Sequence, residues 1–152
     1  MTQILEALSG GGETSEGAEN AGRIAIAAIL VEVARADETY LAREQSMIDR
    51  VLAERFGIGP AEAASLREEG EEAQEEAVDL VHFTRAIKDA VPYEDRVGVI
   101  EALWCVILAD GDVDYQESAL VRRLAGLLYV SDQDSGLARQ RVADAMQRAR
   151  SG

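Results

Sequence analysis

The feature that most constrains how this chain can fold is an internal repeat with a constant offset of 73 residues. The acidic segment 110–117 has a weaker copy at 37–44, and both ends of the two segments are separated by that offset. Identical residues recur at the same offset on both sides of the segments, as in Leu30/Leu103, Val33/Val106, Ala36/Ala109 and Arg50/Arg123. We therefore expect a chain built by duplication of one structural unit.

The length and the apolar residues of the chain favour a single all-α domain. The 152 residues suit one domain of common size. Hydrophobic residues make up 47% of the sequence and aromatic residues only 5%, so Ala, Leu, Val and Ile must fill the core. Small and medium aliphatic side chains let helices approach each other closely. We expect one helical bundle with a duplicated helix-loop-helix pair.

Apolar residues recur at helical spacing along most of the chain after residue 20. This spacing predicts a helix-loop-helix pair, formed by residues 21–36 and a second helix that ends at Gly57. The pair is repeated at residues 93–109 and 115–129. Three further helices are predicted at residues 61–69, at residues 71–90 and at the end of the chain up to about residue 150. Gly70 is the predicted joint before the fourth helix, which Pro92 ends. Ala77, Val81 and Leu137 are predicted to face inward with the other apolar residues.

The first 20 residues differ in composition from the rest of the chain. After a short stretch compatible with helix, residues 9–17 contain four glycines and no large apolar side chain. Glycine raises the entropic cost of ordering, and nothing apolar offsets it here. We therefore expect residues 1–20 to form a flexible segment with a Gly-rich linker, and residues 21–152 to form the helical domain.

The charge balance indicates which partners are compatible with the chain. Its 29 acidic and 15 basic residues leave a net charge of −14, which repels nucleic acid and anionic membrane surfaces. A divalent cation or a basic protein surface suits this charge. The single cysteine excludes an intrachain disulfide, and no segment has the roughly 20 apolar residues needed for membrane insertion. We expect a cytoplasmic protein.

The second acidic segment has the residues of a candidate metal site. Asp110 follows a helix, where its charge opposes the helix dipole at a cost of about 0.3–1 kcal/mol. Gly111 permits a tight turn, so that Asp110, Asp112 and Asp114 can direct oxygen ligands towards Ca²⁺ or Mg²⁺. The segment begins like an EF-hand loop but lacks its sixth-position glycine and twelfth-position glutamate. An ordinary EF-hand is therefore excluded.

Two interpretations of these carboxylates remain open. In the first, Glu117 closes a looser metal site from the next helix, or Asp37 and Glu44 of the first copy join it. In the second, Asp114 caps the helix, Glu117 reaches back to the cap, and Asp110 forms a local turn without metal. The first copy has fewer potential ligands, so we expect any metal to bind the second copy.

The remaining chemistry-bearing residues do not indicate an enzyme. His82 is the only histidine and has no second ligand or base at a suitable spacing. Cys105 lies beside a tryptophan on a predicted core helix, where a cysteine is more often a packed side chain than a nucleophile. The sequence contains no nucleophile elbow, phosphate-binding glycine loop or HExxH motif.

The residues around the second acidic segment resemble the TerB-like tellurite-resistance family. The resemblance lies in Ala109-Asp110-Gly111-x-Val113-Asp114-x-x-Glu117 after Leu103-Trp104, with Phe83-Thr84-Arg85 upstream and Arg122-Arg123-Leu124 downstream. It implies a bundle of about seven helices with pseudo-twofold symmetry, similar also to the N-terminal domain of DjlA-type co-chaperones. It further implies divalent metal at the acidic loops, whose matching residues are Asp37, Glu44, Asp110, Asp112, Asp114 and Glu117.

Two functions are compatible with these observations. The first is a cytoplasmic binding module of the stress or tellurite response, whose acidic loops bind a divalent cation, a basic partner or both. The second is a structural or oligomerising helical domain without metal, whose exposed faces bind a protein or another copy of the chain. Neither function includes catalysis.

Overall fold

The computed structural model describes residues 2–36, 39–76, 79–109, 113 and 115–151, with side chains described from residue 16 onwards. Seven helices and no strand are present in this part of the chain, which confirms the predicted all-α class. They are α1 (Thr2–Ala34), α2 (Ala42–Phe56), α3 (Pro60–Glu76), α4 (Leu80–Ala90), α5 (Tyr93–Leu108), α6 (Tyr115–Leu127) and α7 (Asp132–Ser151). None of these helices, as far as they are described, is both long and apolar enough to cross a membrane.

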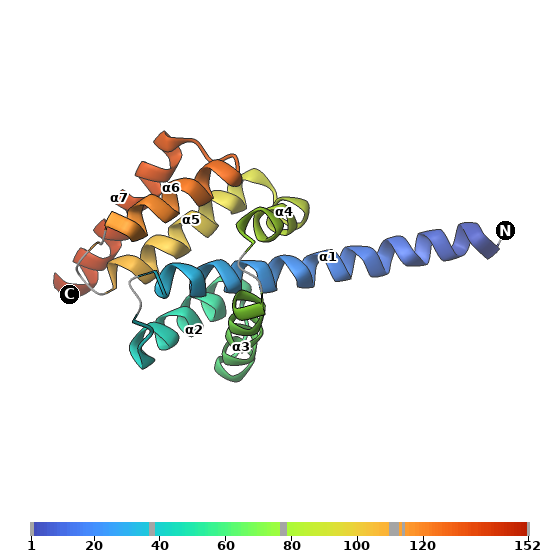
Figure 1. Cartoon of the computed structure of the whole chain (residues 1–152), viewed down its shortest axis with the longest axis horizontal. Coiled ribbons are helices and arrows are strands. Elements are labelled where there is room, and N and C mark those ends of the chain that lie inside the picture. The colour runs from blue at the N-terminus through green and yellow to red at the C-terminus, as the bar shows by residue number, and fades with distance from the viewer. Residues whose placement is uncertain (1, 37–38, 77–78, 110–112, 114, 152) are drawn as a thin grey trace.

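The C-terminal part of α1 is the central element of the bundle (Figure 1). Every residue of the stretch 25–34 except Glu32 is buried, and α1 contacts each of the helices from α2 to α6. A helix that is apolar on all sides must be surrounded by other helices. The alanines in this stretch allow that close approach, as the amino-acid composition predicts.

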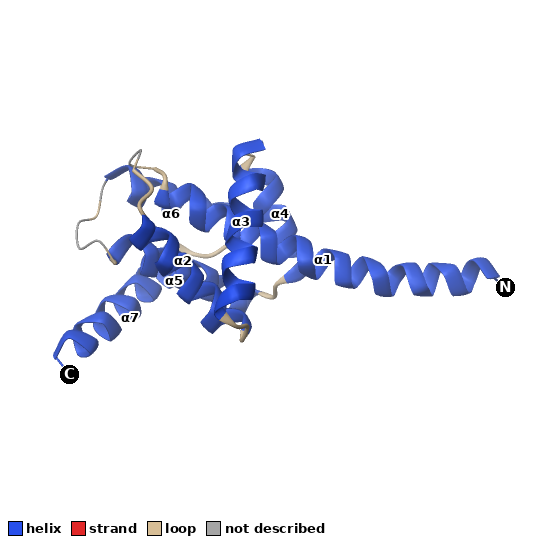
Figure 2. Cartoon of the chain, turned by 90° about the horizontal axis from the view of Figure 1, so that it is seen from below, coloured by secondary structure: helices blue, strands red, loops and turns tan. Residues whose placement is uncertain are grey.

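The N-terminal half of α1 differs from the expected linker. The structure has α1 as one helix from Thr2 through the three consecutive glycines at 10–12, and this half extends away from the other helices (Figures 1 and 2). A helix can continue here because its hydrogen bonds are local and need no partner helix. The division into a flexible segment 1–20 and a domain 21–152 stays a prediction.

The predicted joint at Gly70 is wrong. Helix α3 continues through Gly70 to Glu76, and α4 begins after Asp79, whose carboxylate accepts a hydrogen bond from the His82 N–H at 3.1 Å. A Cβ at Gly70 would lie only 2.6 Å from the Cβ of Ala27. Glycine is therefore needed at position 70 for the close contact between α3 and α1.

Among the described residues, the predicted core positions are buried or half-buried, with two exceptions. Val81 and Leu137 are 46% and 49% exposed. Helix α4 buries Leu80, Thr84 and Ile87 as predicted, with Phe83 in the place expected for Val81. Helix α7 buries Ala138 beside the predicted Val142. Ala77, also predicted to face inward, lies outside the described residues.

The two predicted helix-loop-helix pairs are α1 with α2 and α5 with α6. Helices α2 and α6 begin at residues 42 and 115, which reproduces the sequence offset of 73. In both views the helix ends that flank the α1–α2 and α5–α6 connections lie at the same end of the molecule, opposite the N-terminal extension (Figures 1 and 2). Duplication as the origin of the two pairs stays a prediction from the sequence.

Candidate functional site

The candidate metal site lies where α1 connects to α2 and α5 connects to α6. Of its six predicted ligands, Glu44 and Glu117 belong to the described part of the chain. The other four, Asp37, Asp110, Asp112 and Asp114, lie outside the described residues. The structure therefore describes the helix ends that flank this candidate site.

Glu44 and Glu117 occupy matching places in the two helix pairs. Each is the third residue of its helix, and each is only 4% exposed. A buried carboxylate is unfavourable unless hydrogen bonds or opposite charges compensate it. The repeat therefore places a buried acidic group at the beginning of both α2 and α6.

The carboxylate of Glu44 caps the beginning of α2. The Leu41 N–H donates to Glu44 Oε1 at 2.9 Å, and the Glu44 N–H donates to the Leu41 carbonyl at 3.0 Å. Leucine has no side-chain acceptor, so only the glutamate half of a capping box is formed. This is the backward reach that the sequence predicts for the equivalent residue Glu117.

A polar network attaches the first connection to α3. The Tyr40 hydroxyl donates to Glu71 at 2.6 Å, and Arg67 bridges Glu71 at 2.9 Å and Asp49 at 2.6 Å. Burial and the adjacent Glu71 carboxylate raise the pKa of Tyr40 above its usual value, because both disfavour the phenolate. These contacts hold the chain immediately after α1 in one place.

Arg35, at the end of α1, extends this network. Its guanidinium donates to Gln74 and pairs with Glu75 at 3.1 Å, while the Gln74 amide donates to Glu32 at 2.9 Å. The guanidinium also lies over the Tyr40 ring, 4.6 Å from its centroid. No local sequence pattern predicted this network, because its contacts join residues 39 to 42 positions apart along the chain.

The second connection lacks the residues needed for the same network. At the offset of 73, Arg35 and Tyr40 correspond to Leu108 and Val113, and Asp49 corresponds to Arg122. The two connections therefore differ in their support: ionic and polar contacts hold the first, whereas apolar residues take two of those places in the second.

His82 and Cys105 have no arrangement that indicates catalysis. His82 is exposed, and its ring centroid lies 6.0 Å from that of Phe83. Burial raises the pKa of the Cys105 thiol, as do the nearby carboxylates of Glu101 and Glu54, which disfavours the reactive thiolate. Across the described ranges, no three His, Cys, Asp or Glu side chains are grouped closely enough to hold a metal ion.

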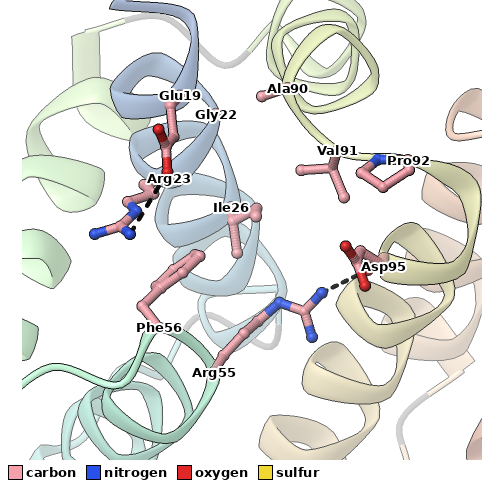
Figure 3. A pocket seen from close by; sticks show the side chains of 10 residues that line it. All are labelled: Glu19, Gly22, Arg23, Ile26, Arg55, Phe56, Ala90, Val91, Pro92 and Asp95. Carbon is pink, nitrogen blue, oxygen red and sulfur yellow. Dashed lines mark hydrogen bonds and ion pairs between the residues drawn. The ribbon is translucent and has the colours of Figure 1, made fainter. Parts of the chain in front are cut away.

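A cavity of about 370 Å³ lies between α1, the end of α2 and the α4–α5 turn (Figure 3). The sequence did not predict it. Its two arginines are already engaged: Arg23 lies 4.7 Å from the centroid of the Phe56 ring, and Arg55 donates to the backbone carbonyl of Asp95. The two arginines of this cavity therefore connect α1 with α2 and α2 with α5.

The described structure defines an all-helical domain whose two helix pairs, α1 with α2 and α5 with α6, flank the two acidic connections. A family model described as Tellurite resistance protein TerB matches residues 23–140, which is well over half of the chain. The chain belongs to this family, as its acidic-loop residues predict. No curated protein and no solved structure matches the chain.

Proposed function

We propose that this chain is a non-catalytic binding module of the TerB family that takes up a divalent cation at its acidic connections. Asp110, Asp112, Asp114 and Glu117 would hold the ion, with Asp37 and Glu44 as contributors from the first copy. The observation that carries the proposal is the matched burial of Glu44 and Glu117, both 4% exposed. A stress response that includes tellurite is the process in which we place it.

The chemistry of these residues fits Ca²⁺ or Mg²⁺. Both ions prefer oxygen ligands, and carboxylates are the common protein donors. One oxygen of Glu44 already accepts the Leu41 N–H, so its ligand capacity is reduced. The second copy has more carboxylates and glycine at the turn, and is therefore the better candidate.

Titration of the chain with Ca²⁺ and Mg²⁺, followed by amide NMR, tests this proposal. We expect saturable shifts at residues 110–117 at ion concentrations up to about millimolar, the range of weaker calcium modules. The double variant Asp110→Asn/Asp112→Asn should lose them. Glu62→Gln/Glu69→Gln, which removes two exposed charges from α3, should keep them. Shifts that are absent, or unchanged in the first double variant, would exclude this metal site.

The alternative function is protein interaction or self-association without metal. Leu41 and Tyr115, which flank the two connections, are 46% and 80% exposed. Exposed apolar groups beside acidic segments suit a partner surface with basic and apolar side chains. If this function is the correct one, Asp112→Ala will not change binding, and solution scattering will show association that Tyr115→Ala weakens.

A further inference from the structure

Another cavity, of about 360 Å³, lies among α5, α6 and α7. Its lining consists of Trp104 from α5, Ser118 and Arg122 from α6, and Asp132, Ser135, Gly136 and Arg139 from α7. The residues on α6 and α7 recur at the three- and four-residue spacing that places them on one helix face. A Cβ added at Gly136 would meet no atom within 4 Å, so α7 leaves open space there.

The two arginines of this cavity are not paired with described carboxylates. Within 4.0 Å, neither Arg122 nor Arg139 has an acidic oxygen from the described residues. Asp132 also lines the cavity, so its lining carries two positive charges and one negative charge. A local positive excess is unexpected in a chain whose net charge is −14.

The Trp104 ring contacts one of these arginines, and its indole N–H has no hydrogen-bond acceptor among the described residues. The Arg139 guanidinium lies 4.8 Å from the centroid of the Trp104 ring, a cation–π contact that orients the guanidinium beside the cavity. Trp104 is only 5% exposed, and its buried indole N–H has no acceptor among the described residues. A ligand with several acceptor oxygens would complement the guanidinium and hydroxyl donors of this lining.

We propose that the cavity among α5, α6 and α7 binds a small phosphate dianion, either free or as the monoester of a small molecule. Two guanidinium groups match the double charge of the ligand, and the hydroxyls of Ser118 and Ser135 add donors for its oxygens. The cavity is larger than a phosphate group and leaves room for a small organic substituent. None of the lining residues is one of the proposed metal ligands, so phosphate binding here does not require metal at the acidic connections.

The fluorescence of Trp104 provides a direct test, because Trp104 is the only tryptophan in the chain. The full chain is titrated with sodium phosphate and, separately, with glycerol phosphate, and sodium chloride at matched ionic strength serves as the control. We expect a saturable change with a phosphate compound and none with chloride. Tighter binding of glycerol phosphate assigns the site to a monoester, and tighter binding of phosphate assigns it to the free ion. A response no different from that of chloride with both compounds overturns the proposal.

Three single substitutions make the test specific. Arg122→Gln should weaken binding about tenfold, because it removes a charge-assisted hydrogen bond. Arg123 is as exposed as Arg122 but does not line the cavity, so Arg123→Gln should leave the affinity unchanged. Asp132→Asn should tighten binding by removing a like charge. Equal affinities in Arg122→Gln and Arg123→Gln, or weaker binding in Asp132→Asn, would overturn the proposal.

Discussion

Gly70 sets the distance between α3 and α1. Its missing side chain leaves room for Ala27. A Cβ at position 70 would lie 2.6 Å from the Cβ of Ala27 and 2.8 Å from its carbonyl carbon. Backbone cannot move aside as a flexible side chain can. We predict that Gly70→Ala lowers the free energy of unfolding by about 1–3 kcal/mol, measured by urea denaturation.

Gly126→Ala in α6 is the matched control for this prediction. A Cβ at Gly126 would meet nothing within 4 Å, and alanine is favoured over glycine in a helix by up to about 1 kcal/mol. This variant should therefore be as stable as the wild type or more stable. Equal destabilisation by both substitutions would show that the contact with Ala27 is not the cause.

Tyr40 makes a pH-dependent contribution to stability through Glu71. The pKa of Tyr40 is raised in the folded chain, so its stabilisation is complete below the unfolded value of about 10 and is lost as the pH rises through the folded-state pKa. We predict that Tyr40→Phe loses about 1 kcal/mol at pH 7, where the hydrogen bond is intact. Urea denaturation at pH 7 and at pH 11 measures the difference between the variant and the wild type, which should shrink at the higher pH.

Tyr115→Phe is the control for the hydroxyl removed from Tyr40. Tyr115 is 80% exposed at the beginning of α6, so loss of its hydroxyl should leave the stability at pH 7 unchanged. If the free energies of unfolding of Tyr40→Phe and the wild type differ by the same amount at pH 7 and pH 11, the raised pKa of Tyr40 does not contribute to stability as proposed.

At the scale of the helices, the apolar periodicity was sufficient to predict the boundaries of a helix where that helix packs on one clear face. Helices α2, α5 and α6 were predicted to within a few residues for this reason. The boundary between α3 and α4 was misplaced, because a glycine needed for close packing and a glycine at a joint look alike in sequence. The contact of Gly70 with Ala27 joins residues 43 positions apart, a separation that no local pattern contains.

The N-terminal half of α1 gives a prediction about a whole element. Each of its three consecutive glycines at 10–12 disfavours helix by about 1 kcal/mol relative to alanine. We predict that replacing all three by alanine increases the helical signal at 222 nm in circular dichroism. The thermal midpoint of the bundle should change by no more than about 2 °C, because the fully buried stretch of α1 begins at residue 25. A larger shift would mean that the extension contributes to the packed core.

At the scale of the whole molecule, the sequence predicted the all-α class and the family but only part of the candidate site. The acidic connections stand out in the sequence because their carboxylates are close together along the chain. The network of Tyr40, Glu71, Arg67 and Asp49 was missed, because its contacts join residues from three separate elements. The cavity of Arg122 and Arg139 could not be predicted for the same reason, because its lining comes from three helices.

Helix α1 is both the centre of the bundle and the only described element that extends far from it (Figure 1). A group attached to its outer half would therefore be connected to the core through one continuous helix. Insertion of one residue near position 18 would turn the outer half by about 100° and displace it by about 1.5 Å, without altering any buried contact. The number of residues in this one helix would thus set the direction of any group attached to its outer half.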